Sequence, residues 1–139
     1  MVKRSMNSNK EENIWLEWQE KADEDLLSLK ALLKHQEGSP STGCFLAQQA
    51  VEKLLKSVLV FHGAELEKIH DLLVLLNKIK PYEPEISQFS EDVAVLTRYY
   101  IETRYPGDYP EFTWKECEDA FKIAEKIMEY VKQLTSVSS

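Results

Sequence analysis

Arginines, tyrosines and an acid crowd into one short stretch in the last third of the chain. It reads Arg98-Tyr99-Tyr100-Ile101-Glu102-Thr103-Arg104-Tyr105-Pro106. Guanidinium groups bind phosphates through paired hydrogen bonds, and aromatic rings stack on nucleobases. The stretch therefore predicts a site for a nucleotide or an RNA phosphate. A purely structural interpretation is also open, because arginines are favoured at helix C-termini and tyrosines pack their rings at the ends of bundles.

A second polar group lies on the expected central helix of the chain. Lys53 and Lys56 could add positive charge to a phosphate site, although Lys56 also has the spacing of an i,i+4 ion pair with Glu52. Apolar residues share that side of the helix, which is compatible with a self-complementary dimer face or with packing inside one chain. The polar members of the group are Gln48, Gln49, Glu52, Lys53 and Lys56.

Other kinds of chemistry lack their usual sequence signals. His62 and His70 are too far apart for one helical face, and His35 stands alone, so we expect solvent-facing or capping histidines and no metal site. The glycines are scattered, which leaves no phosphate-binding glycine loop. No serine or cysteine has a nearby base in the sequence. We expect no cofactor.

Composition limits the fold and the partners. The chain has 139 residues, 43% hydrophobic and 29% charged, which is typical of one soluble domain. Its 4 glycines and 5 prolines favour long helices over a sandwich or barrel. The net charge of −7 excludes general electrostatic attraction to nucleic acid, so no DNA partner is expected. The apolar run Leu72–Leu76 is too short to span a membrane, and no signal peptide is visible. With Cys44 and Cys117 interpreted as reduced thiols, we expect a cytoplasmic protein.

Apolar periodicity and helix-ending residues predict an all-α fold. The fold is an antiparallel up-and-down helical bundle of four long helices plus one short helix, with a disordered N-terminal tail over 1–12 and the bundle domain over 13–135. Ser41 and Thr42 are candidate caps of the central helix, and Thr113-Trp114-Lys115-Glu116 is a capping box. Asp25 interrupts an apolar stripe, and we expect it to pair with a basic residue or cap a backbone. The expected helices are 11–35, 44–62, a short one from 70 that stops before Pro81, 85–104, and one opening at the capping box.

Four segments together resemble the HEPN domain family, over about residues 15–134. They are Trp18-x-x-x-Ala22-x-x-Asp25-Leu26, Ala47-Gln48-Gln49-Ala50-x-Glu52-Lys53, His70-Asp71-Leu72, and Arg98 through Pro106. The resemblance implies a helical bundle that pairs into a homodimer through its central helices. It also implies a partner, because small HEPN proteins are often encoded beside a minimal nucleotidyltransferase and act with it as a toxin–antitoxin or related two-component system.

The resemblance further bears on whether the protein is an enzyme. Some HEPN proteins are metal-independent ribonucleases whose site uses an arginine followed closely by a histidine. Here Arg98 occupies the arginine position, but no histidine follows through Tyr109. The Arg104-Tyr105-Pro106 segment resembles a branch for which nucleotide binding is the usual proposal. We therefore expect a non-catalytic, homodimeric partner of a minimal nucleotidyltransferase that binds a phosphate-bearing ligand. The predicted ligand-binding residues are Arg98, Arg104, Tyr105, Tyr99, Lys53 and Lys56.

Two alternatives stay open at the level of sequence. One is a ribonuclease toxin that uses Arg98 with an unusual acid–base set. The other is a purely structural protein-interaction dimer in which the tyrosines only pack. The sequence does not identify the ligand or the partner, and it does not say whether the site is shared across a dimer.

Overall fold

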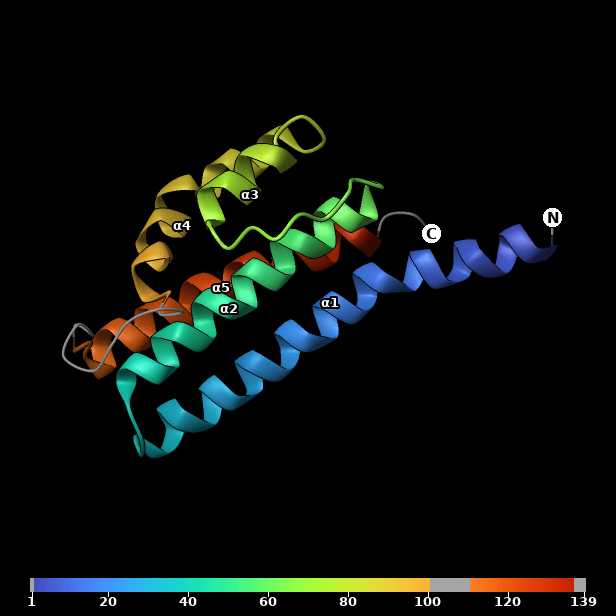
Figure 1. The fold of residues 1–139 in the computed structure, drawn as a ribbon. Coiled ribbons are helices and arrows are strands. Elements are labelled where there is room, and N and C mark those ends of the chain that lie inside the picture. Colours follow the sequence, from blue (N-terminus) through green and yellow to red (C-terminus); the bar gives the residue numbers. More distant parts are fainter. Residues whose placement is uncertain (1, 101–110, 137–139) are drawn as a thin grey trace.

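In a computed structural model of the chain, three long helices carry the fold and a short helical hairpin covers one side (Figure 1). The structure describes residues 2–100 and 111–136, with side chains from residue 14 onward. The long helices are α1 (Val2–His35), α2 (Pro40–Phe61) and α5 (Trp114–Ser136). In Figure 1, α2 and α5 run side by side in the same direction, and α1 runs antiparallel to both.

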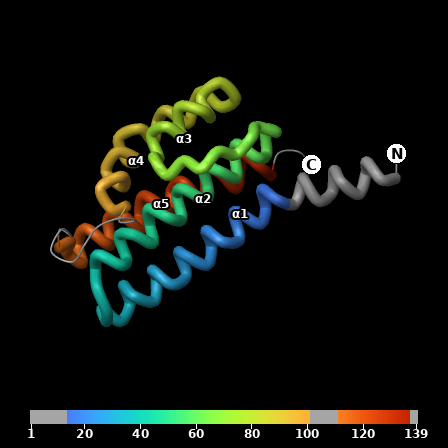
Figure 2. The backbone as a smooth tube through the Cα atoms, in the orientation of Figure 1, coloured from blue at the N-terminus to red at the C-terminus, as the bar shows by residue number. Residues whose placement is uncertain are grey.

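The hairpin consists of α3 (Leu72–Ile79) followed by three consecutive short pieces. These are a 3₁₀ turn η1 (Pro84–Phe89), the helix α4 (Ser90–Leu96) and a second 3₁₀ turn η2 (Thr97–Tyr99). The backbone trace in Figure 2 shows this unit lying over α2 and α5, on the side away from α1. The all-helical fold is confirmed for the part of the chain that the structure describes. The expected five helices are found in this part of the chain, but the fourth is shorter than expected, since the predicted 85–104 helix is divided into η1, α4 and η2.

The predicted 85–104 helix is divided into several pieces. Pro84 opens a 3₁₀ turn, and a second 3₁₀ turn begins at Thr97, whose hydroxyl donates a 2.7 Å hydrogen bond to the carbonyl oxygen of Ala94. A similar bond from Ser57 to the carbonyl oxygen of Leu54, at 2.6 Å, leaves α2 continuous, so such a hydroxyl does not by itself end a helix. Tyr100 then adopts an extended conformation, with φ −79° and ψ 127°, so the helix ends before it.

Helix starts follow the short polar side chains that precede them. Ser39, and not the predicted Ser41 or Thr42, caps α2, because its side chain accepts from the Ser41 amide and Pro40 occupies the first helical position. Asp71 caps α3 by accepting from the amides of Leu73 and Val74. The predicted capping box at α5 is confirmed: Thr113 Oγ1 accepts from the Glu116 amide at 3.1 Å, and Glu116 Oε1 accepts from the Thr113 amide at 3.0 Å.

The core surrounds α2, whose buried residues lie on all sides of the helix. Gly43 lets α2 approach α5 closely, since a Cβ at this position would overlap Cys117 Sγ. The two cysteines, which sequence spacing kept apart, therefore meet in the core as free buried thiols. α1 begins earlier than the predicted Glu11. The predicted boundary between the tail (1–12) and the domain (13–135) concerns residues whose side chains lie largely outside the described set, and it stays a prediction.

Candidate functional site

Arg98 lies at the end of η2 with its guanidinium braced by aromatic rings. The guanidinium carbon stands 5.8 Å from the centre of the Tyr99 ring and 5.6 Å from that of Phe112. A long ion pair of 3.7 Å joins Arg98 Nη2 to Glu116 Oε2, and 59% of the Arg98 side chain is exposed. Stacking on ring faces fixes the plane of a guanidinium while its N–H groups stay able to donate to an anion.

Tyr99 supports Arg98 from within the core. It is 2% exposed, and its ring meets Phe112 edge to face with 4.7 Å between ring centres. Burial raises the pKa of Tyr99 to about 12, with a further contribution from the neighbouring Cys44 thiol. The ring has almost no surface left for a ligand, so stacking on a base, as the sequence led us to expect, does not fit the placement of Tyr99.

Arg104 and Tyr105 lie outside the described residues, within the segment 101–110. Their predicted roles in holding phosphate and in shaping the ligand site therefore stay predictions. The described residues on either side are Tyr100, which directly precedes the segment, and Glu111, which directly follows it.

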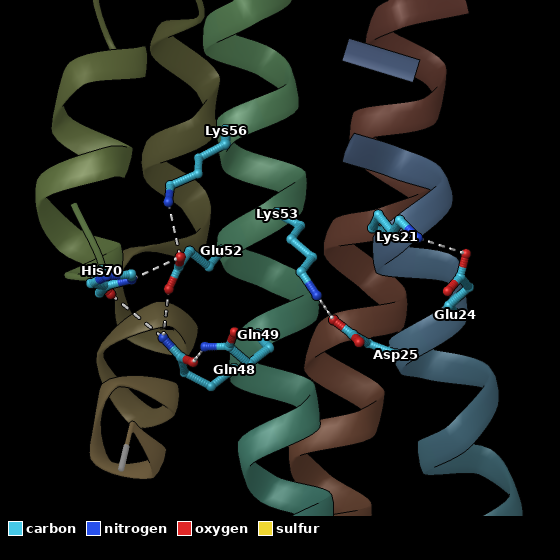
Figure 3. Close-up of polar contacts among 9 residues, drawn as sticks. All are labelled: Lys21, Glu24, Asp25, Gln48, Gln49, Glu52, Lys53, Lys56 and His70. Atoms are coloured by element: carbon cyan, nitrogen blue, oxygen red, sulfur yellow. Dashed lines mark hydrogen bonds and ion pairs between the residues drawn. The ribbon is translucent and has the colours of Figure 1, made fainter. Parts of the chain in front are cut away.

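The two lysines of α2 point in different directions (Figure 3). Lys53 reaches toward α1, where its Nζ lies 2.6 Å from Asp25 Oδ2. This contact is the basic partner expected for Asp25. Lys56 instead turns toward His70 and the hairpin side, and its ammonium also stands 5.5 Å from the centre of the Trp18 ring. The structure therefore does not bring Lys53 and Lys56 to one ligand.

Glu52 is the centre of a polar cluster in which Gln48 and Lys56 are buried and His70 is exposed (Figure 3). Its Oε2 lies 3.0 Å from Lys56 Nζ and 3.0 Å from His70 Nδ1. Gln48 Nε2 is at 3.5 Å from both Glu52 Oε1 and the His70 carbonyl oxygen. Burying charge in a helical core is costly unless partners surround it, and these contacts supply the partners. The cluster thus ties the loop before α3 to the middle of α2.

The described part of the chain also limits what the site can hold. Within residues 14–100 and 111–136, no three His, Cys, Asp or Glu side chains gather closely enough to hold a metal ion. In the same part of the chain no helix is both long and apolar enough to cross a membrane.

Comparison with known proteins identifies the family to which this helical fold belongs. The model of the HEPN domain matches residues 15–134, which is most of the chain. The protein belongs to the HEPN family. The fold agrees with this assignment, since the crystal structure of TT1696 from Thermus thermophilus superposes with a TM-score of 0.75 at 32% identity, covering 87% of this chain and 98% of that one.

Two further relatives extend the comparison. The crystal structure of ST0689, an archaeal HEPN homologue, gives a TM-score of 0.70 at 26% identity and covers 87% of this chain and 97% of that one. The protein called "Putative toxin MJ1304" of Methanocaldococcus jannaschii is 29% identical over 81% of this chain and 82% of its own length. The HEPN family and the helical fold expected from the four sequence segments are thereby confirmed.

Within this HEPN fold, Tyr100 lies between Arg98 in the chain and the polar cluster around Glu52, which it contacts at the exposed His70. Its ring stacks on His70, with 5.1 Å between ring centres and 18° between planes. The ring of Phe45 lies on another side, with 6.4 Å between its centre and that of Tyr100. Arg98 stands only two residues earlier in the chain. The structure thus brings a histidine from the loop before α3 to the segment in which the sequence contains none.

His70 is solvent-facing, as expected, with 42% of its side chain exposed, but sequence reasoning missed its contact with the buried carboxylate of Glu52. Its partner Glu52 is 18 positions earlier, and no local pattern links the two. The sequence offered Lys56 as the i,i+4 partner of Glu52, and that pair is found at 3.0 Å, but nothing in it indicated His70 as a second partner.

Proposed function

We propose that this HEPN protein is the toxin-type member of a two-component system and that it binds a phosphate-bearing ligand, RNA or a nucleotide, at Arg98. The observation that carries the proposal is the exposed guanidinium of Arg98, held over the rings of Tyr99 and Phe112 beside a long ion pair. A guanidinium fixed in this way loses little conformational entropy when it binds phosphate. Arg104 and Tyr105 complete the proposed site from the adjoining segment. The name of the Methanocaldococcus jannaschii relative supports the toxin-type role.

Direct titration tests the ligand site. Fluorescence anisotropy with a labelled single-stranded RNA, and calorimetry with ATP and GTP, would be run on the wild type, Arg98→Ala and Arg104→Ala. Lys122→Ala is the matched control, because it removes one positive charge from an exposed ion pair on α5. We expect saturable binding that both arginine variants weaken by about tenfold or more, as for loss of a charge-assisted contact, while the control binds like the wild type. Equal binding by all four proteins would show that Arg98 is not part of the ligand site.

The partner in this proposal is a minimal nucleotidyltransferase, and the protein itself acts as a homodimer. Sedimentation velocity on the purified chain tests the dimer, and co-purification with the product of a neighbouring nucleotidyltransferase gene tests the partner. Most of α2 is enclosed by helices of its own chain, so pairing through α2 would use part-exposed residues such as Phe45, Leu46 and Gln49. A chain that sediments as a monomer and does not co-purify with the transferase would contradict this part of the proposal.

A ribonuclease is the second candidate function, and the position of His70 favours it. RNA cleavage without a metal needs a group that accepts and donates protons near neutral pH, and histidine is the side chain suited to this. The structure supplies such a residue beside Tyr100, held by Glu52. Gel analysis of RNA after incubation with the wild type separates this candidate from binding without cleavage.

A further inference from the structure

A negative charge lies beside the proposed phosphate site, on the first turn of α5. Glu116 Oε2 is 3.7 Å from Arg98 Nη2, and 33% of the Glu116 side chain is exposed. Charge-assisted hydrogen bonds between a guanidinium and a carboxylate are about 2.7–2.9 Å long, so this contact is too loose to be one. Glu116 therefore adds its charge to the site without a close bond to Arg98.

The capping box of α5 holds this charge in place. Glu116 Oε1 accepts hydrogen bonds from the Thr113 amide at 3.0 Å and from the Thr113 hydroxyl at 3.2 Å. A carboxylate in the first turn of a helix is also favoured by the positive end of the helix dipole. These interactions tie one carboxylate oxygen to the start of α5, so the negative charge stays beside Arg98 when a ligand arrives.

The orientation of Arg98 has a different source. Its guanidinium lies over the rings of Tyr99 and Phe112, both of which are buried. The Phe112 amide also donates a hydrogen bond to Ser41 Oγ at 3.2 Å, which fastens Phe112 to the start of α2. Because buried rings position the guanidinium, the effect of Glu116 on an anion bound there is electrostatic repulsion.

This repulsion depends on the charge of the phosphate group. A phosphodiester within an RNA strand carries a single negative charge, whereas a terminal phosphate carries nearly two at about pH 7.5, since its second pKa is about 6. Two unit charges about 4–6 Å apart in water repel each other by an energy equivalent to about three- to fivefold in a binding constant. For a terminal phosphate this factor is squared, to about 10- to 25-fold. A fixed carboxylate thus opposes a terminal phosphate more than a phosphodiester.

We propose that Glu116 is a specificity-determining residue that shifts the Arg98 site away from terminal phosphates and toward the phosphodiesters of an RNA strand. The inference rests on the proposed phosphate site at Arg98 and narrows its ligand to RNA. An arginine alone favours a terminal phosphate, because the attraction between opposite charges also grows with the charge of the ligand. Glu116 offsets that advantage, so contacts along the strand decide which ligand binds.

Competition measurements test this role of Glu116. Labelled single-stranded RNA without terminal phosphates would be displaced, at about pH 7.5, by adenylyl-adenosine, which has only a phosphodiester, or by AMP, which has only a terminal phosphate. Glu116→Gln keeps the shape of the side chain, and glutamine also serves in a capping box. Glu118→Gln is the matched control, because it removes the same charge from an exposed ion pair with Lys122.

The expected result is an unequal gain in affinity. Glu116→Gln should bind adenylyl-adenosine about three- to fivefold more tightly than the wild type and AMP about 10- to 25-fold more tightly. Glu118→Gln should bind both as the wild type does. Glu116→Ala removes the charge together with the capping bonds, so it should show the same change in selectivity despite its lower stability. That agreement would assign the effect to the charge and not to the cap.

Several outcomes would overturn the inference. Weaker binding of both competitors by Glu116→Gln would mean that Glu116 positions Arg98, and an equal gain for both would mean that ligand charge does not matter. Failure of AMP to compete with any of the proteins would have the same consequence. Arg98→Ala tests the site itself. RNA binding that survives this substitution unchanged removes the proposed function, whereas Arg98-dependent binding without a change in selectivity removes only the role of Glu116.

Discussion

At the level of single residues, the tyrosine beneath Arg98 makes the folded protein sensitive to alkaline pH. Burial raises the pKa of Tyr99 from its ordinary value of 10.0 to about 12. Since the neutral phenol is favoured in the folded state, its stabilising contribution is complete below about pH 10 and is lost as the pH rises through about 12. Two pH units correspond to at most about 3 kcal/mol. We expect the free energy of unfolding to fall less steeply over this range in Tyr99→Phe than in the wild type.

Urea unfolding followed by circular dichroism at several alkaline pH values would measure this difference. Tyr82→Phe is the matched control, because Tyr82 is 45% exposed, against 2% for Tyr99, and the substitution removes the same hydroxyl. The control should keep the wild-type dependence on pH. Parallel curves for Tyr99→Phe and the wild type would show that another group governs alkaline unfolding.

The two core thiols should be unreactive for as long as the helices stay packed. Contact with Cys117 and burial both raise the pKa of the Cys44 thiol, whereas contact with Cys44 lowers the pKa of the Cys117 thiol. Both cysteines are fully buried, so their protection rests on the exclusion of reagent from the core. We expect a thiol reagent to label neither cysteine in the native protein and both in denaturant. A Lys122→Cys variant, which places a thiol on the exposed side of α5, supplies the positive control. Rapid labelling of the native wild type would mean that α2 and α5 separate readily.

At the level of elements, the parts that sequence could predict are those encoded by nearby residues. The capping box at Thr113 and the α3 start near Asp71 depend on neighbours within three or four positions, and both are found. The 3₁₀ turns on either side of α4 were missed because an apolar pattern of helical spacing does not separate an α-helix from a short 3₁₀ turn. The distinction between local and long-range contacts also explains which parts of the candidate site could be predicted. Arg98 was recognisable from its local motif, whereas the contact of His70 with Glu52 exists only after the loop before α3 folds back on α2.

Alanine should destabilise the protein at two glycines for different reasons: steric overlap with α5 at Gly43 and backbone conformation at Gly63. In Gly43→Ala the new Cβ would overlap Cys117 Sγ and lie 3.0 Å from Leu29 Cδ1. We expect the overlap to outweigh the gain in helix propensity and to lower the free energy of unfolding by about 1–3 kcal/mol. Gly63→Ala meets no atom within 4 Å but sits at φ +78°, so its cost of about 1–2 kcal/mol comes from left-handed backbone alone.

A double variant distinguishes the two mechanisms. Cys117→Ala removes the overlapping sulfur, so Gly43→Ala should cost less in that background than in the wild type, as measured by chemical denaturation. The cost of Gly63→Ala should be the same in both backgrounds, because the two sites share no contact. An equal cost of Gly43→Ala in the two backgrounds would show that α2 and α5 move apart to relieve the overlap.

At the level of the whole molecule, an acidic protein that binds RNA must do so through few contacts. The net charge of −7 opposes a polyanion, so attraction comes only from local cations such as Arg98 and the proposed Arg104. Each phosphate neutralised on a single strand contributes about −0.7 to the slope of log K against log salt concentration. We therefore expect a slope of about −1.4 for the wild type and about −0.7 for Arg98→Ala, since two phosphate contacts become one.

Anisotropy titrations between about 0.05 and 0.3 M salt would measure the two slopes. Lys122→Ala tests whether the overall charge of the protein affects binding. It should change the affinity slightly at every salt concentration and leave the slope of log K against log salt concentration as in the wild type. A slope of about −3 or steeper in the wild type would require more cationic contacts than these two arginines provide. In that case RNA would lie across a larger surface, and the small site argued here would be only part of it. The shallow slope is thus the expected signature of a protein that holds one or two phosphates against its own charge.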